Sequence, residues 1–276
     1  MATRREIFDR LVVAAESVYG VHEARQIAQM VLSARGGVSL TDLVVRGDEE
    51  VDIDDLEQIL VELSAARPVQ YILGVAEFCG ANFAVGEGVL IPRPETEELV
   101  ARVAASSPKS LLDVGTGSGC IAVSLARMLP RADVWAVDIS DDALHYAAMN
   151  SRKAGVDIRL MKADALSLPD FGRKFDAVVS NPPYIPISER ESMRRNVTEY
   201  EPSMALFVDD DDPLLFYRRI AQQARGMLNA EGKVWFEIHE NFAEEVHHML
   251  LCEDYTDVEI FNDINEKARI VCARVW

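Results

Sequence analysis

Two hydrophobic patterns follow one another along the chain. Over residues 4–66, apolar side chains recur at the spacing of a helix packed on one side, as at Ile7 and Leu11. Glycines at position 20 and at positions 36–37 interrupt this period and mark helix ends. We therefore predict a small N-terminal helical bundle over residues 1–66. A module of this kind more often orients a macromolecular substrate than reacts with it.

From residue 107 onward, short apolar runs of strand length alternate with longer stretches of helical period. This alternation is typical of a parallel sheet covered by helices. The predicted strands span residues 110–114, 134–138, 158–163, 175–180, 234–238, 258–262 and 269–275. The predicted helices span residues 97–105, 120–129, 141–154, 213–228 and 242–251. The pattern predicts an α/β fold with a seven-stranded sheet.

The last two predicted strands differ from the others because no helix-length segment lies between Ile264 and Arg269. A parallel connection needs a crossover, so these two strands must be antiparallel neighbours joined by a hairpin. We expect one antiparallel ending on an otherwise parallel sheet.

A connector joins the two patterns. Residues 67–94 alternate apolar and small residues around several glycines, which predicts a β-hairpin. Thr96 or Glu95 is then expected to cap the helix 97–105. The predicted division is a helical substrate-recognition domain (1–66), a β-hairpin connector (67–94) and a catalytic domain (95–276).

Composition narrows the class of protein. Of the 276 residues, 49% are hydrophobic, yet no apolar run approaches the ~20 residues that cross a bilayer, so we expect no membrane partner. The four cysteines are widely separated, and the adjacent His247 and His248 are read as a solvated helix face, which predicts reduced thiols, a cytoplasmic protein and no metal site. The net charge of −18 disfavours a duplex DNA partner. We expect a monomer.

A glycine-rich loop follows the first strand of the catalytic domain. The sequence Asp113-Val114-Gly115-Thr116-Gly117-Ser118-Gly119 precedes a helix and then a strand that ends at Asp138. Glycine loops in this position surround nucleotide-type ligands, and the acid at the end of the second strand accepts hydrogen bonds from a ribose. The charge of Asp113 disfavours a phosphate and suits an amino-bearing ligand. S-adenosylmethionine fits this set, although a tight turn of any α/β unit would also explain the glycines.

The tetrapeptide Asn181-Pro182-Pro183-Tyr184 follows the apolar run 175–180. Proline cannot continue a sheet ladder, so the strand ends here and exposes acceptors at its carboxyl end. The Asn181 side chain and the Pro182 carbonyl offer two acceptors, and Tyr184 offers a flat ring. Such a group suits a planar NH2, although a Pro-Pro turn with an asparagine cap would also explain it.

Together these motifs resemble the HemK/PrmC family, the methyltransferases that modify the glutamine side-chain nitrogen in the Gly-Gly-Gln motif of peptide chain release factors. Further matches are Arg67-Pro68-Val69-Gln70-Tyr71-Ile72-Leu73-Gly74, Leu90-Ile91-Pro92-Arg93-Pro94-Glu95-Thr96-Glu97 and Tyr200-Glu201-Pro202. The resemblance covers nearly the whole chain and implies a seven-stranded, Rossmann-like class I fold dependent on S-adenosylmethionine. It also implies S-adenosylhomocysteine as product and a release factor as protein partner.

The resemblance assigns roles to individual residues. It implies that the cofactor is bound by Asp113, Gly115, Thr116, Gly117, Ser118, Gly119, Asp138, Asp164, Ala165 and Asn181. It implies that the glutamine is held by Asn181, Pro182, Pro183 and Tyr184, with Asn181, Pro182 and Tyr184 positioning it for transfer. Some family members carry an aromatic residue at the position of Ala165, so stacking on the adenine must come from elsewhere or be weaker.

Other functions stay open at this stage. Related tetrapeptides occur in adenine-N6 nucleic-acid methyltransferases, and a ribosomal-protein glutamine is a further possible substrate. A noncatalytic binding module would not need Asp113, Asp138 and Asn181 together. The arginines Arg190, Arg194 and Arg195 form either a solvated charge set or a small clamp for a protein or an RNA phosphate.

Overall fold

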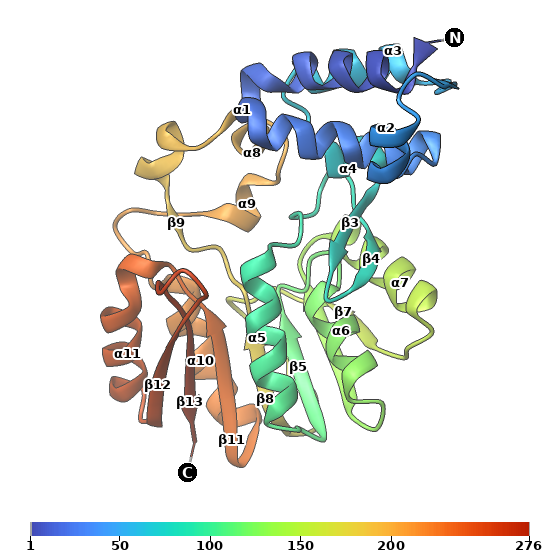
Figure 1. The fold of residues 1–276 in the computed structure, drawn as a ribbon. Coiled ribbons are helices and arrows are strands. Elements are labelled where there is room, and N and C mark those ends of the chain that lie inside the picture. Colours follow the sequence, from blue (N-terminus) through green and yellow to red (C-terminus); the bar gives the residue numbers. More distant parts are fainter. Residues whose placement is uncertain (1, 276) are drawn as a thin grey trace. The chain divides into compact units, whose positions relative to one another are not determined.

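The computed structural model describes residues 2–275, which form two compact units (Figure 1). The first unit contains the residues up to Val75 together with Ser192–Glu201. The second contains Ala76–Glu191 and the residues from Pro202 onward. These units differ from the predicted division, because a segment from the middle of the catalytic sequence belongs with the helical unit.

The first unit is the expected helical bundle. Its helices are α1 (Arg4–Gly36), α2 (Leu40–Val45), α3 (Leu56–Ser64), α4 (Val69–Leu73) and α8 (Arg195–Thr198). Two short strands, β1 (Ala2–Thr3) and β2 (Glu50–Val51), pair antiparallel. Gly20 kinks α1 with a φ of 74°, a conformation that side-chain-bearing residues rarely adopt. In the returning segment, Arg194 pairs with Glu23 and the Tyr200 hydroxyl donates to the Ala65 carbonyl at 2.8 Å.

The second unit is built on a seven-stranded sheet in the order β12-β13-β11-β8-β5-β6-β7. Its strands are β5 (Ser110–Val114), β6 (Asp133–Asp138), β7 (Arg159–Lys162), β8 (Phe175–Ser180), β11 (Leu228–Glu237), β12 (Thr256–Asn262) and β13 (Ala268–Arg274). The strands from β11 to β7 run parallel, whereas β13 pairs antiparallel with both β11 and β12. The predicted antiparallel hairpin is therefore confirmed.

Alternate residues of the central strands enter two separate cores, as the two-residue period of a strand requires. Leu112, Val178 and Phe236 pack on one face with α10 (Leu215–Met227) and α11 (Ala243–Cys252). On the other face, Leu111 and Trp235 are among the residues that pack with α5 (Pro94–Ala105) and α6 (Cys120–Met128). Figure 1 shows α5 and α6 in front of the sheet and α10 behind it. Parallel strands covered on both faces explain why their sequences are almost wholly apolar.

The start of α5 corrects one expectation. The helix begins at Pro94, with Arg93 at the N-cap position and no side-chain capping bond, so neither Thr96 nor Glu95 is the cap. Proline suits this position because the first N–H of a helix has no partner within the helix. Thr96 therefore lies in the first turn of α5, where its hydroxyl donates to Glu237.

The remaining elements connect these layers. The expected connector hairpin is formed by β3 (Val75–Phe78) and β4 (Ala81–Ala84), and α7 (Asp141–Ala154) has the predicted bounds. Short elements are β9 (Ile185–Pro186), η1 (Ile187–Ser192), α9 (Ser203–Leu206), β10 (Phe207–Val208) and η2 (Glu240–Phe242). Within residues 2–275, no helix is both long enough and apolar enough to span a membrane.

Candidate active site

Three strands of the second unit end level with one another. Val114 of β5 pairs with Val137 of β6 on one side and with Ser180 of β8 on the other. The next residue on each strand, Gly115, Asp138 and Asn181, therefore lies in one row at the edge of the sheet, where Asp138 is the last residue of β6. The carboxyl ends of parallel strands at such a row are where open α/β sheets bind ligands. The sheet thus brings the predicted glycine loop, acid and tetrapeptide together.

Hydrogen bonds to Asp113 and to strand β6 hold the glycine loop in place. Thr116 Oγ1 donates to Asp113 Oδ2 at 2.6 Å, and the N–H groups of Gly115 and Thr116 both donate to the Val137 carbonyl. Gly119 has no room for a side chain, because a Cβ there would lie 3.0 Å from Ala147 Cα on α7. The third glycine of the motif therefore permits close packing of loop and helix.

Asp113 is buried beneath this loop. Its side chain is fully inaccessible and does not line the pocket described below, and burial raises its pKa to about 7. Its Oδ1 has no hydrogen-bond partner among residues 2–275. In this structure Asp113 supports Thr116, and direct binding of a ligand amine to Asp113 stays a prediction.

Asp138 connects the end of β6 to the glycine loop. Its Oδ2 accepts from the Gly117 N–H at 2.8 Å, and its Oδ1 accepts from the Ser140 N–H at 2.9 Å. Burial raises its pKa. Each carboxylate oxygen can accept a second hydrogen bond, so Asp138 retains acceptor capacity toward the pocket that it lines.

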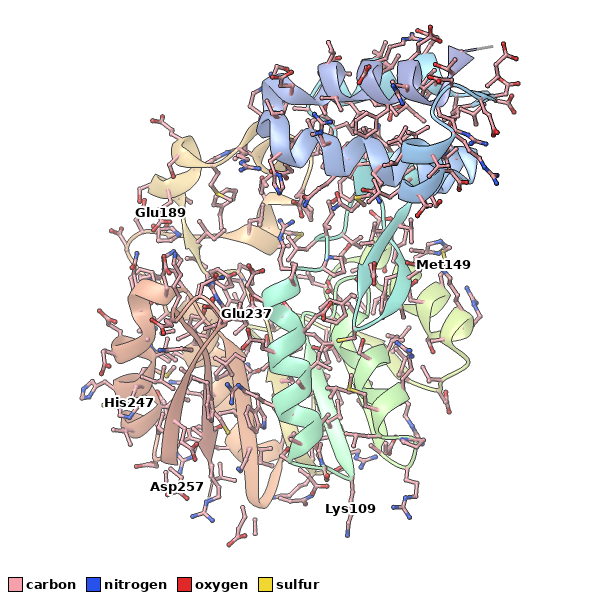
Figure 2. All side chains as sticks on the ribbon, viewed as in Figure 1. Lys109, Met149, Glu189, Glu237, His247 and Asp257 are labelled. Atoms are coloured by element: carbon pink, nitrogen blue, oxygen red, sulfur yellow. The ribbon has the colours of Figure 1, made fainter. Side chains whose placement is uncertain are left out.

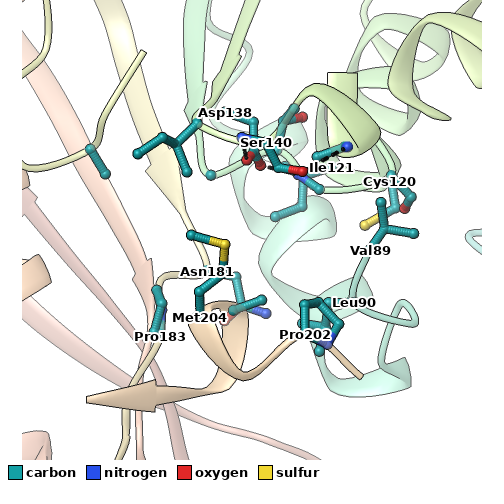
Figure 3. A pocket seen from close by; sticks show the side chains of 18 of the residues that line it. Val89, Leu90, Cys120, Ile121, Asp138, Ser140, Asn181, Pro183, Pro202 and Met204 are labelled. Atoms are coloured by element: carbon teal, nitrogen blue, oxygen red, sulfur yellow. Dashed lines mark hydrogen bonds between the residues drawn. The ribbon is translucent and has the colours of Figure 1, made fainter. Parts of the chain in front are cut away.

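A cavity of about 400 Å³ opens above this row (Figure 3). Its size is that of a small-molecule site. The lining contains the predicted residues Gly115, Thr116, Gly117, Ser118, Asp138, Asp164, Ala165, Asn181 and Pro183. Asp113, Gly119, Pro182 and Tyr184 are not part of the lining. Figure 3 shows Asp138 and Ser140 on one side of the cavity and Asn181 and Pro183 on another.

Much of the cavity wall is apolar and was not predicted from the sequence. Val89 and Leu90 come from the segment before α5, Ile139 follows β6, and Phe216 comes from α10. Ile139 keeps 45% of its surface exposed, which is high for a large apolar side chain. An apolar residue directly after the predicted ribose-binding acid was the available sequence signal, whereas nothing in the sequence connected Phe216 with the pocket.

The tetrapeptide side of the pocket contains a hydrogen-bond network. Asn181 Nδ2 donates to Thr96 Oγ1 at 3.2 Å, and Thr96 Oγ1 donates to Glu237 Oε2 at 2.6 Å. The Tyr184 hydroxyl donates to Glu237 Oε1 at 3.2 Å, and its ring packs edge-on against His239. Stacking of the Tyr184 ring on a substrate amide stays a prediction. Sequence analysis missed Glu237, which lies at the carboxyl end of β11 (Figure 2).

The three arginines after the tetrapeptide have partners within the chain. Arg190 lies over the Phe207 ring at 5.6 Å, Arg194 pairs with Glu23, and Arg195 pairs with Glu199. These contacts agree with a set of surface charges, and a clamp for a protein or an RNA phosphate stays a prediction.

Two family models match the chain. One is described as a methyltransferase domain and covers residues 111–200, which include the glycine loop and the tetrapeptide. The other is described as a PrmC N-terminal domain and covers residues 15–74 of the helical unit. Each unit of the structure therefore contains a segment that a known family matches.

Curated proteins match over nearly the full length. A Bacteroides thetaiotaomicron protein named release factor glutamine methyltransferase is 41% identical over 264 residues, covering 94% of this chain and 95% of its own. A Flavobacterium psychrophilum protein of the same name is 40% identical over 272 residues, covering 95% of each. Among solved structures, a methyltransferase from Pyrococcus furiosus has a TM-score of 0.54 at 16% identity, covering 71% of this chain and 89% of that one. That likeness shows the class I methyltransferase fold of the second unit.

Proposed function

The chain belongs to the release factor glutamine methyltransferase family, and from this membership we propose its substrate and donor. The enzyme transfers the methyl group of S-adenosylmethionine to the side-chain amide nitrogen of the glutamine in the Gly-Gly-Gln motif of release factors. The supporting observation is a single cavity that carries a glycine loop with Asp138 on one side and Asn181 on the other. The family relatives named above support the choice of substrate.

The residues of the cavity suit S-adenosylmethionine better than a dinucleotide. Arg93 is the only basic residue lining the cavity among residues 2–275, while Asp138 and Asp164 are acidic. The phosphates of a dinucleotide would be repelled by the two acids and attracted by the one arginine. A cationic ligand without phosphate would be attracted by the two acids and repelled by the arginine. We assign the ribose hydroxyls to the remaining acceptor sites of Asp138.

We also propose which side chains cover the adenine, because Ala165 has no aromatic ring. The backbone N–H of Leu166 donates to Asp164 Oδ1 at 2.8 Å, which fixes the turn on which both residues lie. Ile139, Leu166 and Phe216 line the same cavity. We propose that these apolar side chains cover the faces of the adenine in place of an aromatic residue at position 165.

Methyl transfer to an amide depends more on the orientation of the amide nitrogen than on a catalytic acid or base. When bound, S-adenosylmethionine supplies an electrophilic methyl group and leaves as S-adenosylhomocysteine. A primary amide is a weak nucleophile, because its lone pair is delocalised into the carbonyl. We propose that Asn181 Oδ1, which lines the cavity, holds one N–H group and that the carbonyl of Pro182, the next residue outside the lining, holds the other, so that the lone pair is directed into the cavity. Orientation of this kind supplies several kcal/mol, part of the roughly 7–11 kcal/mol attributed to full preorganisation. The nitrogen loses its extra proton to water after transfer.

The test is methyl transfer to a purified release factor. The protein is incubated with isotope-labelled S-adenosylmethionine, and peptide mass spectrometry locates the label. We expect one methyl group on the glutamine of Gly-Gly-Gln, and none on a release factor in which alanine replaces that glutamine. Ribosomal proteins and duplex DNA serve as parallel substrates. Label in a ribosomal protein or in adenine, with none in the release factor, would overturn the proposal.

A further inference from the structure

The register of the sheet places a buried acid beside Asn181. Phe236 of β11 pairs with Ser180 of β8, so Glu237 and Asn181 are the next residues on neighbouring strands. Trp235 faces the core that contains α5, and side chains two residues apart on a strand face the same way. Glu237 therefore points toward α5, where its Oε2 meets Thr96. Glu237 and Thr96 retain only 1% and 2% of their surface.

The chemistry of the three side chains fixes the direction of each hydrogen bond. A carboxylate oxygen has no hydrogen to give, so the hydroxyl of Thr96 donates to Glu237. That hydroxyl has one hydrogen, and its oxygen can then only accept from Asn181. While Glu237 Oε2 carries no proton, the Asn181 atom 3.2 Å from Thr96 Oγ1 is therefore the NH2 group. If Glu237 is protonated on Oε1, the oxygen near Tyr184, its Oε2 still accepts from Thr96, and the direction is unchanged.

The orientation of the Asn181 amide decides what a substrate meets. With Nδ2 committed to Thr96, Oδ1 is the group left to face the cavity that Asn181 lines, and it has no hydrogen bond within residues 2–275. An amide substrate presents N–H donors, so the opposite orientation would set donors against donors. We propose that Glu237 and Thr96 are positioning residues, which orient Asn181 so that its oxygen receives the substrate N–H. This inference rests on the proposed function.

Reversing the polarity of the network tests the inference directly. In Asn181→Asp, the residue facing Thr96 offers only acceptors, and the single Thr96 hydrogen cannot serve two acids. Adding Glu237→Gln supplies an NH2 group that donates to Thr96 Oγ1, while its oxygen still accepts from Tyr184. Thr96 can then donate to Asp at position 181, which restores a continuous network.

We expect the double variant Asn181→Asp/Glu237→Gln to turn over about tenfold faster than Asn181→Asp alone, an effect within the coupling range of residues in one network. Methyl transfer to the release factor gives kcat and KM for each variant. Losses in the two single variants that simply multiply in the double variant would overturn the inference. Absence of methyl transfer by the parent enzyme would instead overturn the proposed function.

A second measurement does not depend on introducing an acid at position 181. Thr96→Val removes the hydroxyl with little change in shape, and Thr96→Ser retains it. We expect Thr96→Val to lower kcat about three- to tenfold, with unchanged KM for the release factor, and Thr96→Ser to recover most of the loss. Thr256→Val is the matched control, because Thr256 lies on the edge strand β12 and its hydroxyl donates to the Arg274 carbonyl of β13. Equal kcat in Thr96→Val and in the control contradicts the inference.

Discussion

Two buried acids of the catalytic unit each hold a threonine of the cavity wall, yet their surroundings differ. Asp113 and Thr116, three residues apart, form the loop pair, and Glu237 and Thr96, 141 residues apart, form the tetrapeptide pair. Both threonine–acid bonds measure 2.6 Å. Asp113 keeps one oxygen without a partner in the described chain, whereas the second oxygen of Glu237 accepts from Tyr184.

This difference separates two uses of a buried carboxyl group. A buried carboxylate with an unpartnered oxygen is poorly compensated for its lost hydration, so its charged form is disfavoured. A change of pH should therefore alter the free energy of unfolding chiefly through the loop pair. Burial also raises the pKa of Glu237, but the hydrogen bonds from Thr96 and Tyr184 oppose that rise. Removal of a member should therefore affect the tetrapeptide pair more than a change of pH does. The predictions below test this contrast in order of expected effect.

The largest effect is expected from the pH dependence of stability at Asp113. Folding raises its pKa from 3.8 to about 7, so the folded chain keeps a proton that the unfolded chain has lost between these values. The contribution of Asp113 to stability is therefore complete below the lower value and is lost as pH rises toward 7, by on the order of 4 kcal/mol in total. Urea unfolding of the wild type and of Asp113→Asn between about pH 4 and pH 8 measures the difference.

The control for this experiment is Asp157→Asn, which removes an exposed acid of the same unit. We expect its stability to follow the wild type at every pH. A constant difference between wild type and Asp113→Asn over this pH range would show that burial does not hold the Asp113 proton. The contrast between the two pairs would then lose its electrostatic basis.

Removal of Glu237 should cost more stability than removal of Asp113. Glu237→Ala leaves two hydroxyl groups without an acceptor, at about 1–3 kcal/mol each, so we expect a loss of about 3 kcal/mol. Asp113→Ala leaves one hydroxyl and should lose about half as much. Denaturant unfolding at one pH compares the two, with Glu245→Ala as an exposed control. Equal losses would mean that the second partner of Glu237 adds nothing.

On the tetrapeptide side, Asn181→Ala separates catalysis from cofactor binding. The substitution deletes one of the two acceptors that we propose for the substrate amide, and we expect a rate loss of at least about 2.7 kcal/mol, or a hundredfold. Cofactor affinity should change much less, because the glycine loop and Asp138 remain. Methyl transfer and calorimetric titration of S-adenosylmethionine measure the two effects. Transfer at nearly the wild-type rate would remove the positioning role of Asn181.

At the glycine loop, Asp138→Ala should affect cofactor affinity more than the rate of methyl transfer. Loss of a charged acceptor for the ribose should weaken S-adenosylmethionine and S-adenosylhomocysteine binding by about 2 kcal/mol, some thirtyfold. The Gly117 N–H also loses its partner in this variant. Calorimetry with each ligand is the measurement. Wild-type affinity in Asp138→Ala, or tight NAD binding by the parent, would exclude the cofactor assignment.

The same two pairs show which parts of the site can be predicted from sequence. Asp113 and Thr116 lie within one loop, so a local motif contains the whole interaction. Thr96 and Glu237 meet only after α5 has docked on the sheet and β11 has paired with β8. Thr96 was instead expected to cap α5, because threonine near a helix start favours that reading. Glu237 lay inside the predicted strand 234–238 and was given no role.

The fold was more accessible than the site because it depends on repeating patterns. Strand β8 and helix α7 begin and end where the apolar period predicts. The hairpin of β12 and β13 followed from a connection too short for a helix. No period could show that Ser192–Glu201 belongs with the helical unit, since its position depends on Arg194 meeting Glu23 and Tyr200 meeting Ala65.

That returning segment makes the helical unit discontinuous in sequence. The chain passes between the two units three times, after Val75, after Glu191 and after Glu201. A shortened enzyme that starts after Val75 would keep Ser192–Glu201 but lose Glu23 and Ala65, leaving Arg194 and Tyr200 without these partners. Exchange of the helical unit between relatives would therefore have to move two separate stretches of the gene together, and residues in the two stretches are expected to change in concert during evolution.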